Sequence, residues 1–426
     1  ISCVFLCKHL AKAKLELSVY HILIRLYQDV HLVMIYALHI GDKGMSKINN
    51  ILKKDIVLSI SIILAILSMF IITPDKEYIG YIDYRTLAIL FSLMAVMEGF
   101  KQMGVFGRIA HALVYRCKNI NSLVVILVML CFFGSMLITN DVSLITFVPL
   151  TITVFDMLPD KVRSCWLMTV VIMQTIAANL GSMLTPIGNP QNLYLFTLSG
   201  MSLVEFLKLM LPLSFVSLVV IIVWIAVKSF IADKKFRFDD GIDFKIDLND
   251  KEYSRKLFVM YAVLFLVCLL TVARLIPVQA TLIAVILMIV IFDRKVLKKV
   301  DYSLLLTFTA LFIFIGNVGR VGVFSDFLAS VINGREMYTA IASSQIMSNV
   351  PAAILLTGFT DNIKMLILGT DIGGLGTLIA SMASLISFKY IIREKDCSKG
   401  RYISLFTVYN LMFLIILILF VNVFKI

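Results

Sequence analysis

Charged residues are scarce in this sequence. They make up 15% of its 426 residues, whereas hydrophobic residues make up 60%, and the mean hydropathy is +0.97. A soluble domain is typically about 25% charged and about 45–50% apolar, so a water-soluble fold of this length could not cover so much apolar side chain. The composition therefore excludes a soluble globular protein and predicts an all-α polytopic membrane protein whose surroundings are the lipid bilayer.

Histidine is also scarce, and cysteine lacks the spacing that metal or redox chemistry needs. The five histidines lie outside the most apolar parts of the chain, and the seven cysteines form no C-x-x-C pair. An intramembrane protease needs a Ser–His or Asp pair, or histidines and a glutamate on one helix. We therefore expect no cofactor, and an intramembrane enzyme is only a remote alternative.

Basic residues exceed acidic ones, and the formal net charge is +12. The lysines and arginines occur in short clusters between apolar runs, which is typical of cytoplasmic loops and not of a nucleic-acid-binding surface. We therefore expect no nucleic-acid partner. The positive-inside rule predicts a multi-pass protein of the cell (inner) membrane, with the Met45 end in the cytoplasm and the C-terminus on the extracytoplasmic side.

Uninterrupted apolar runs and interrupted ones alternate along the chain. Because lipid cannot satisfy free backbone groups, a broken helix persists only where it is packed in protein or lines a cavity. We interpret the interrupted segments 122–158 and 337–359 as re-entrant helical hairpins, and 163–200 and 361–391 as broken transmembrane helices. The uninterrupted runs, each near the length needed to cross a bilayer, are 55–73, 84–103, 210–230, 256–274, 277–292, 302–318 and 402–424.

Two parts of the sequence resemble one another. The segment DYRTLAILFSLMAVMEGFKQMGVF matches DYSLLLTFTALFIFIGNVGRVGVF, and SMLITN, ending at Asn140, matches SQIMSN, ending at Asn349. The segment 179–189 likewise matches 371–381. One additional helix between the copies turns the second copy upside down, and inverted repeats with paired broken helices are typical of secondary transporters.

The repeat defines the expected domain organisation. Charged residues and histidines interrupt the apolar stretches of the first segment, so we expect it to be an extension peripheral to the core. The expected divisions are the N-terminal extension 1–44, a first transporter repeat 45–230, a cytoplasmic linker 231–255, a topology-inverting helix 256–272 and a second transporter repeat 273–426.

Polar residues concentrate at the four interruptions. A helix that stops inside the membrane exposes unpaired N–H groups at one end and unpaired C=O groups at the other. The N-terminal ends suit an anion, and the freed carbonyls with Ser, Thr and Asn oxygens suit Na⁺. The candidate substrate- and ion-binding residues are Thr139, Asn140, Asp141, Ser143, Asn179, Ser182, Thr185, Gly188, Asn189, Pro190, Asn192, Ser348, Asn349, Val350, Asp371, Gly373, Gly374, Thr377 and Ser381.

Asp141 and Asp371 are the carboxylates placed deep in these interruptions. A carboxylate at such a depth is typical of an ion ligand or a proton carrier, so the coupling ion is expected to be Na⁺ or H⁺. The alternative is that each aspartate only caps a helix N-terminus and exchanges no proton.

The motifs TNDVSLITFVPL, ANLGSMLTPIGNPQN, SQIMSNVPAAILL and GTDIGGLGTLIASMASLISFK together resemble the ion transporter superfamily. That group includes divalent-anion:sodium symporters, citrate-transporter-like permeases, arsenite efflux permeases and a class of sodium–proton antiporters. The resemblance implies that the two hairpin tips bind substrate and ions, and it places a sodium ion near Asn140, Asp141, Gly188 and Asn192. It also implies an elevator-like motion and a homodimer.

Three departures from the symporter pattern are informative. The first tip ends in Asp141 where the symporters carry threonine, the second ends in Val350, and the second loop, 380–384, lacks a Pro-Asn pair. The departures therefore argue against one of the sodium sites that the resemblance implies, and an acidic tip is closer to the arsenite and antiporter branches.

The expected function is ion-coupled secondary active transport of a small anion, either a di- or tricarboxylate or an inorganic oxyanion. Arsenite efflux and Na⁺/H⁺ antiport are the alternatives within transport. A channel is less favoured, because paired hairpins with polar tips make a closed site and not a continuous pore.

Overall fold

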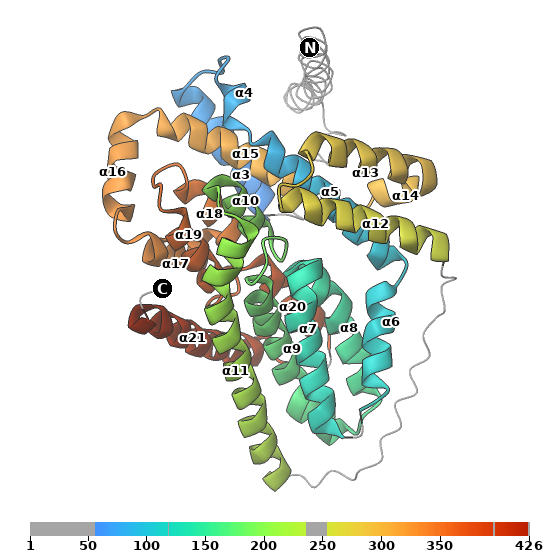
Figure 1. Cartoon of the computed structure of the whole chain (residues 1–426). Coiled ribbons are helices and arrows are strands. Elements are labelled where there is room, and N and C mark those ends of the chain that lie inside the picture. Colours follow the sequence, from blue (N-terminus) through green and yellow to red (C-terminus); the bar gives the residue numbers. More distant parts are fainter. Residues whose placement is uncertain (1–55, 118, 236–253, 395–396, 425–426) are drawn as a thin grey trace, which may run out of the picture. The chain divides into compact units, whose positions relative to one another are not determined.

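Every regular element is a helix in the part of the chain that the computed structural model describes, which is residues 56–117, 119–235, 254–394 and 397–424 (Figure 1). The helices of the first half are α3 (Ile56–Ile71), α4 (Tyr78–Tyr81), α5 (Tyr84–Gln102), α6 (Val105–Val114), α7 (Ile120–Ile138), α8 (Asn140–Asp156), α9 (Asp160–Ser182), α10 (Pro190–Ser199) and α11 (Leu203–Lys235). Those of the second half are α12 (Arg255–Val272), α13 (Val278–Phe292), α14 (Arg294–Leu297), α15 (Tyr302–Gly319), α16 (Gly322–Ile332), α17 (Glu336–Met347), α18 (Asn349–Leu356), α19 (Ile363–Gly373), α20 (Met382–Ile391) and α21 (Lys399–Phe424).

Six of the described helices are long and apolar enough to cross a membrane, or seven if the bent pair α5 and α6 counts as one span. The prediction of an all-α polytopic membrane protein is therefore confirmed. The seven uninterrupted runs also occur as helices, namely α3, α5, α11, α12, α13, α15 and α21.

The predicted linker, 231–255, overlaps the end of helix α11. Helix α11 continues to Lys235, because no glycine or proline interrupts the sequence from Phe215 to that point. The rest of the linker up to residue 253, and the extension 1–44, lie outside the described residues. Residues 61–426 form one compact unit, and the contacts described below lie within it.

The helices break where the sequence predicts interruptions. Helices α7 and α8 meet at Thr139, α17 and α18 meet at Ser348, and each pair packs together as a hairpin. The loop 183–189 separates α9 from α10, and the loop 374–381 separates α19 from α20. Whether the hairpins turn back within the membrane stays a prediction, since α7 alone is long enough by its 19 residues to span it.

Both hairpin tips have the same backbone conformation. Thr139 has φ 68° and ψ 151°, and Ser348 has φ 76° and ψ 154°. This region strongly favours glycine, and another residue placed there costs about 1–3 kcal/mol. The residue after each tip makes an equivalent backbone hydrogen bond to the loop of its own copy. The Asn140 N–H donates to the Gly188 carbonyl (3.0 Å), and the Asn349 N–H donates to the Ala380 carbonyl (2.9 Å).

Two further contacts recur between the copies. Gly181 of α9 packs against the Phe132 carbonyl of α7, and Gly373 of α19 packs against Ser344 of α17, so closely that a Cβ at either glycine would overlap its neighbour. The Thr185 hydroxyl donates to the Met136 carbonyl at 2.5 Å. In the second copy, the hydroxyl of Thr377 donates to the carbonyl of Gln345 at 3.3 Å. These matched contacts support the internal repeat, while its upside-down arrangement stays a prediction.

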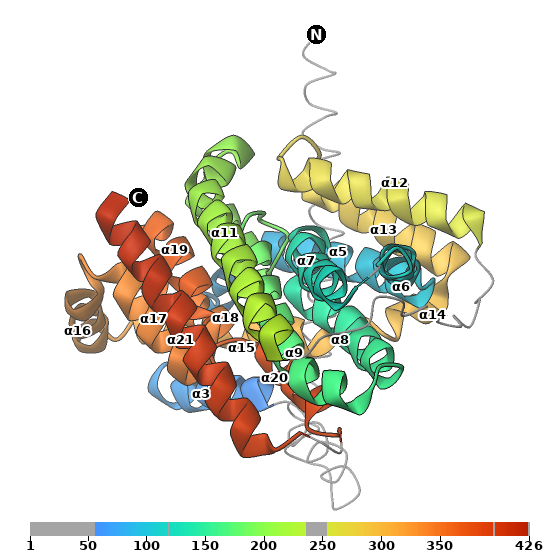
Figure 2. The same ribbon diagram turned by 90° about the horizontal axis from the view of Figure 1, so that it is seen from below.

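Helix α9 is the most buried of the candidate spans. In its most apolar window 89% of the residues are buried inside the protein. Gln174 donates to the Leu127 carbonyl (3.1 Å) and to the Thr151 hydroxyl (2.8 Å), while Thr175 donates to Ser387 of α20 (2.7 Å). Helix α9 therefore joins the first hairpin to the second copy. The two longest described helices, α11 and α21, lie side by side, with Trp224 against Tyr409 (Figure 2).

A second group of helices is held by aromatic and ionic contacts. Phe100 of α5 packs against Tyr261 and its neighbours on α12, and α5 also packs against α13. At the C-terminal end of α15, Arg320 donates to Asp75 at 2.7 Å. This hydrogen bond holds the pKa of Asp75 below its usual range.

We expect Gly181→Ala to destabilise the protein, because the new Cβ would lie 2.0 Å from the Phe132 carbonyl oxygen. Overpacking against backbone costs about 1–3 kcal/mol. Gly107→Ala is the matched control, since a Cβ there meets nothing within 4 Å and alanine favours a helix. Thermal unfolding in detergent should give a lower midpoint for Gly181→Ala alone, and equal midpoints would contradict the close packing of α7 on α9.

Candidate functional site

The four breaks meet in a cluster of amide and hydroxyl side chains, centred on Asn179 near the C-terminal end of α9. The Asn179 Oδ1 accepts hydrogen bonds from the Asn140 amide (3.1 Å) and the Ser381 hydroxyl (3.0 Å). Its Nδ2 donates to the Gly374 carbonyl (3.4 Å). All four residues are buried, and they come from the first hairpin, the first broken helix and the second broken helix. A single buried amide thus ties three of the breaks together.

The second copy supplies the complementary contact through Asp371. The Asp371 Oδ1 accepts a hydrogen bond from the Asn189 amide (3.1 Å), and the same amide donates to the Ser182 hydroxyl (3.2 Å). In the aligned repeats, Asp371 corresponds to Asn179, and Ser381 corresponds to Asn189. Each broken helix therefore bonds the loop of the other copy, and the two repeats interlock reciprocally at this point.

Four helices begin at the cluster, and each begins at a polar residue: Thr139 for α8, Asn189 for α10, Ser348 for α18 and Ser381 for α20. Pro190 follows as the first residue of α10, where its missing N–H leaves nothing unsatisfied. Helix N-termini offer free N–H donors and a partial positive charge. The arrangement can therefore bind negative charge at several points.

Two of these N-termini meet an acidic side chain of the protein itself. Asp141 lies in the first turn of α8, and the Asp371 carboxyl lies beside Asn189, Gln191 and Asn192 at the start of α10. The first turns of α18 and α20 contain no acidic residue. Among the residues whose burial the structure describes, no lysine, arginine or histidine is buried. The cluster thus combines two carboxyl groups with helix N-termini and uncharged donors.

The two aspartates differ in their surroundings. Asp141 is partly exposed, and its backbone N–H donates to the Asn140 side chain. Thr139, not Asp141, accepts the capping hydrogen bond of α8, so the interpretation of Asp141 as a helix cap is wrong. Asp371 is 3% exposed, and its Oδ2 is buried without a hydrogen-bond partner among the described residues.

Helix α10 is held electrostatically at both ends. Asp371 lies at its N-terminus, and at its C-terminus Arg274 donates to the carbonyls of Gly200 (2.9 Å) and Phe196 (3.4 Å). The guanidinium also lies 5.5 Å from the centre of the Phe196 ring. An acid at the N-terminus and a base at the C-terminus both interact favourably with the helix dipole, so the two contacts stabilise α10 with its N–H groups toward the cluster.

Five of the predicted residues have local roles outside the hydrogen-bonded cluster. The Ser143 hydroxyl donates to the Cys131 carbonyl within the first hairpin (3.4 Å), and Val350 is buried and apolar. Thr185 and Thr377 attach the two loops to the hairpins, and Gly373 allows close packing. Of the four residues predicted to bind sodium, two are hydrogen-bonded to each other, because the Asn140 N–H donates to the Gly188 carbonyl. The side-chain oxygen of a third, Asn192, has no partner among the described residues.

Sequence reasoning missed Gln345, which lies on α17 one turn before the second tip. Its amide donates to the carbonyls of Gly373 and Leu375, both at 2.9 Å, and its oxygen accepts from the Thr377 N–H at 2.9 Å. One side chain thus satisfies three backbone groups that the break in α19 sets free. A glutamine inside the SQIMSN motif, which also ends in the second hairpin tip, was the available signal. Ser384, the third residue of α20, was also missed.

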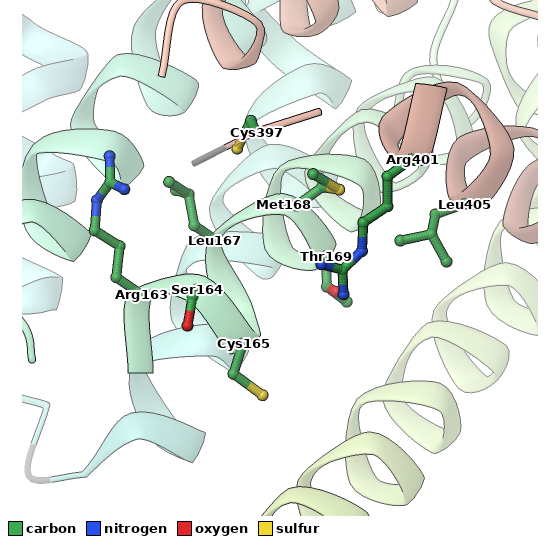
Figure 3. A pocket seen from close by; sticks show the side chains of 9 residues that line it. All are labelled: Arg163, Ser164, Cys165, Leu167, Met168, Thr169, Cys397, Arg401 and Leu405. Carbon is green, nitrogen blue, oxygen red and sulfur yellow. The ribbon is translucent and has the colours of Figure 1, made fainter. Parts of the chain in front are cut away.

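A pocket outside the cluster lies between α9 and the start of α21 (Figure 3). Arg163 beside it donates to Asp156 (2.8 Å) and Glu394 (2.6 Å), which attaches the first hairpin to the end of the second copy. Arg401 extends from α21 toward α9. The lining residues are Arg163, Ser164, Cys165, Leu167, Met168, Thr169, Cys397, Arg401 and Leu405.

Comparison with known proteins gives a consistent result. A family model described as Citrate transporter matches residues 45–363. An uncharacterized transporter of Methanocaldococcus jannaschii is 33% identical over 86% of this chain and 96% of its own length. The inner membrane protein YbiR of Escherichia coli is 30% identical over 76% of this chain and 84% of its own. A shorter match, 27% identical over 33% of this chain and 24% of its own length, is to the arsB transporter of Dictyostelium discoideum.

We expect Asn179→Ala to lower stability markedly, because it leaves the Asn140 amide, the Ser381 hydroxyl and the Gly374 carbonyl without this partner. Each buried polar group left unpaired costs about 1–3 kcal/mol. Asn333→Ala is the control, since Asn333 is exposed at the end of α16. A melting temperature equal to that of the control would refute the central role of Asn179.

Proposed function

Because the chain belongs to the citrate transporter family, a family of membrane transporters, we propose that it is a cation-coupled secondary active transporter of a small anion. The substrate is a di- or tricarboxylate or an inorganic oxyanion. The observation that carries the proposal is the convergence of four helix N-termini on a cluster that contains two carboxyl groups and no buried base.

The anion binds at the second-copy side of the cluster. There the N-termini of α18 and α20 have no acidic residue in their first turns, and helix N-termini bind anions through free N–H groups. Ser348, Asn349 and Ser381 lie at these ends. The Ser384 hydroxyl is buried and has no partner among the described residues, which leaves it available to a bound oxyanion.

The coupling cation binds on the first-copy side, at Asn140, Asp141, Gly188 and Asn192. An anion placed near two carboxylates is repelled unless cations or protons neutralise them. Binding of Na⁺ or H⁺ therefore raises the affinity for the anion, and linkage requires the anion to raise the affinity for the cation equally. This reciprocity is the physical basis of symport in the proposal.

The same two carboxyl groups also favour an alternative, Na⁺/H⁺ antiport, which needs only cation ligands. Arsenite efflux is a further alternative, and the similarity to a transporter named arsB supports it. Family members are named as transporters, which favours transport over an intramembrane enzyme.

The mechanism, assembly and location complete the proposal. The hairpins and broken helices, α7–α10 and α17–α20, move as one elevator-like unit against α5, α12, α13 and α15. The protein forms a homodimer in the cell membrane, with the Met45 end in the cytoplasm. The close mutual packing of α7 with α9 and of α17 with α19 supports treating the hairpins and broken helices as one unit.

We expect proteoliposomes containing the protein to take up one anion from a panel of citrate, succinate, phosphate and sulfate when a Na⁺ or pH gradient is imposed. Asp141→Asn should abolish the dependence on the Na⁺ gradient, because it removes the charge that attracts the ion. Asn333→Ala should transport like the wild type. If no anion is taken up but Na⁺ dissipates a pH gradient, antiport replaces the proposed function.

A further inference from the structure

Positive charge is concentrated in the first turn of α21. This turn contains Lys399 and Arg401 and no acidic residue. A helix N-terminus itself has a partial positive charge, so nearby anions stabilise it and nearby cations do not. Among the described residues, Arg401 makes no hydrogen bond or ion pair with any side chain. This end of α21 therefore favours a negatively charged ligand.

Arg401 directs this charge into the pocket between α9 and α21. Its side chain extends toward α9, where Thr169 lines the same pocket (Figure 3). Arg163 also lines the pocket, but its guanidinium is bound to Asp156 (2.8 Å) and Glu394 (2.6 Å). Of the two arginines, Arg401 is therefore the one that can bind a ligand, while Arg163 binds these two carboxylates.

The rest of the pocket wall is largely apolar and continues along α21. Leu167, Met168 and Leu405 line the pocket. Beyond Leu405, apolar residues follow on the same face of α21 at intervals of three or four positions, namely Val408, Met412, Ile415 and Leu419. Three of them are exposed, Val408 at 58%, Ile415 at 55% and Leu419 at 57%. A ligand that matches both parts has an anionic group at one end and long apolar chains at the other.

The pocket lies at the predicted cytoplasmic ends of the two helices. The stretches 158–163 and 389–401, which contain the starts of α9 and α21, have seven Lys or Arg residues and three Asp or Glu residues. Basic pockets between transmembrane helices on the cytoplasmic side bind the headgroups of anionic lipids. The excess of positive charge favours a headgroup with a net negative charge over a zwitterionic one.

This pocket is separate from the cluster where the four breaks meet. Thr169 precedes Asn179 by ten positions on α9, which is about 15 Å at the rise of an α-helix. None of the side chains of the cluster lines the pocket. A ligand in the pocket is therefore distinct from an anion bound at the cluster.

We propose that the pocket binds the phosphate headgroup of an anionic phospholipid. The phosphate binds Arg401 at the N-terminal end of α21, and the hydroxyls of Ser164 and Thr169 on α9 supply further donors. The acyl chains lie along the exposed apolar face of α21. The headgroup thus joins α9 to α21, beside the ion pairs that Arg163 makes. This inference goes beyond the proposed function and does not depend on which substrate is transported.

Thermal unfolding in detergent tests the site, because a ligand that binds only the folded state raises the unfolding midpoint. Phosphatidylglycerol added to the micelles should raise the midpoint of the wild type, and Arg401→Gln should lose most of that rise. Lys399→Gln is the matched control. It removes the same charge from the same turn, but Lys399 does not line the pocket, so most of the rise should remain. Equal rises in the two variants overturn the proposal.

Two further additions identify the source of the phosphate. Phosphatidylcholine has the phosphate and the acyl chains but no net charge, so it should separate Arg401→Gln from Lys399→Gln less than phosphatidylglycerol does. Inorganic phosphate has no acyl chains and should not separate the two variants. If inorganic phosphate separates them as strongly as phosphatidylglycerol, the pocket binds a free anion and the lipid assignment is wrong. An equal separation by phosphatidylcholine overturns the preference for an anionic lipid.

Cys165 provides a second measurement, in a bilayer. It lines the pocket and is partly exposed. N-ethylmaleimide should therefore modify it more slowly in vesicles that contain phosphatidylglycerol than in vesicles of phosphatidylcholine alone. Mass spectrometry of the peptide that contains Cys165 gives the rate. The difference should disappear in Arg401→Gln and remain in Lys399→Gln. Equal rates for the wild type in the two kinds of vesicle overturn the proposal.

Discussion

A helix that stops among other helices, away from water, must find partners for the backbone groups that it sets free. The rest of this structure depends on that constraint. The four helix breaks meet in one cluster, and nearly every polar side chain there hydrogen-bonds a freed backbone group or another side chain of the cluster. Gln345 alone satisfies three backbone groups, and the Gly188 and Ala380 carbonyls receive the N–H that follows each hairpin tip.

The constraint is met twice, in nearly the same way. Both tips adopt the same left-handed backbone, both loops are attached to their hairpins by a threonine, and both broken helices contain a glycine at the closest approach. The two copies then differ where they meet. Both polar side-chain atoms of Asn179 are hydrogen-bonded, whereas one Asp371 oxygen has no partner among the described residues.

Helix α10 is held at its two ends by different parts of the chain. Its first residues contact Asp371, and its last carbonyls accept hydrogen bonds from Arg274, which lies between α12 and α13. Helix α10 therefore links the cluster to the segment between α12 and α13.

The sequence alone determined the class of protein, the positions of the breaks and the residues available at them, because scarce charge and interrupted apolar runs depend only on local composition. The internal matches also identified which positions correspond, including Asn179 with Asp371. Tertiary structure decided which of these residues meet. The bond from Ser381 to Asn179 and the bond from Asn189 to Asp371 join residues that are far apart in the chain. Such pairs follow from how the helices pack, which no local pattern encodes. For the same reason the sequence could not distinguish the partly exposed Asp141 from the enclosed Asp371, since burial is a property of the whole assembly of helices.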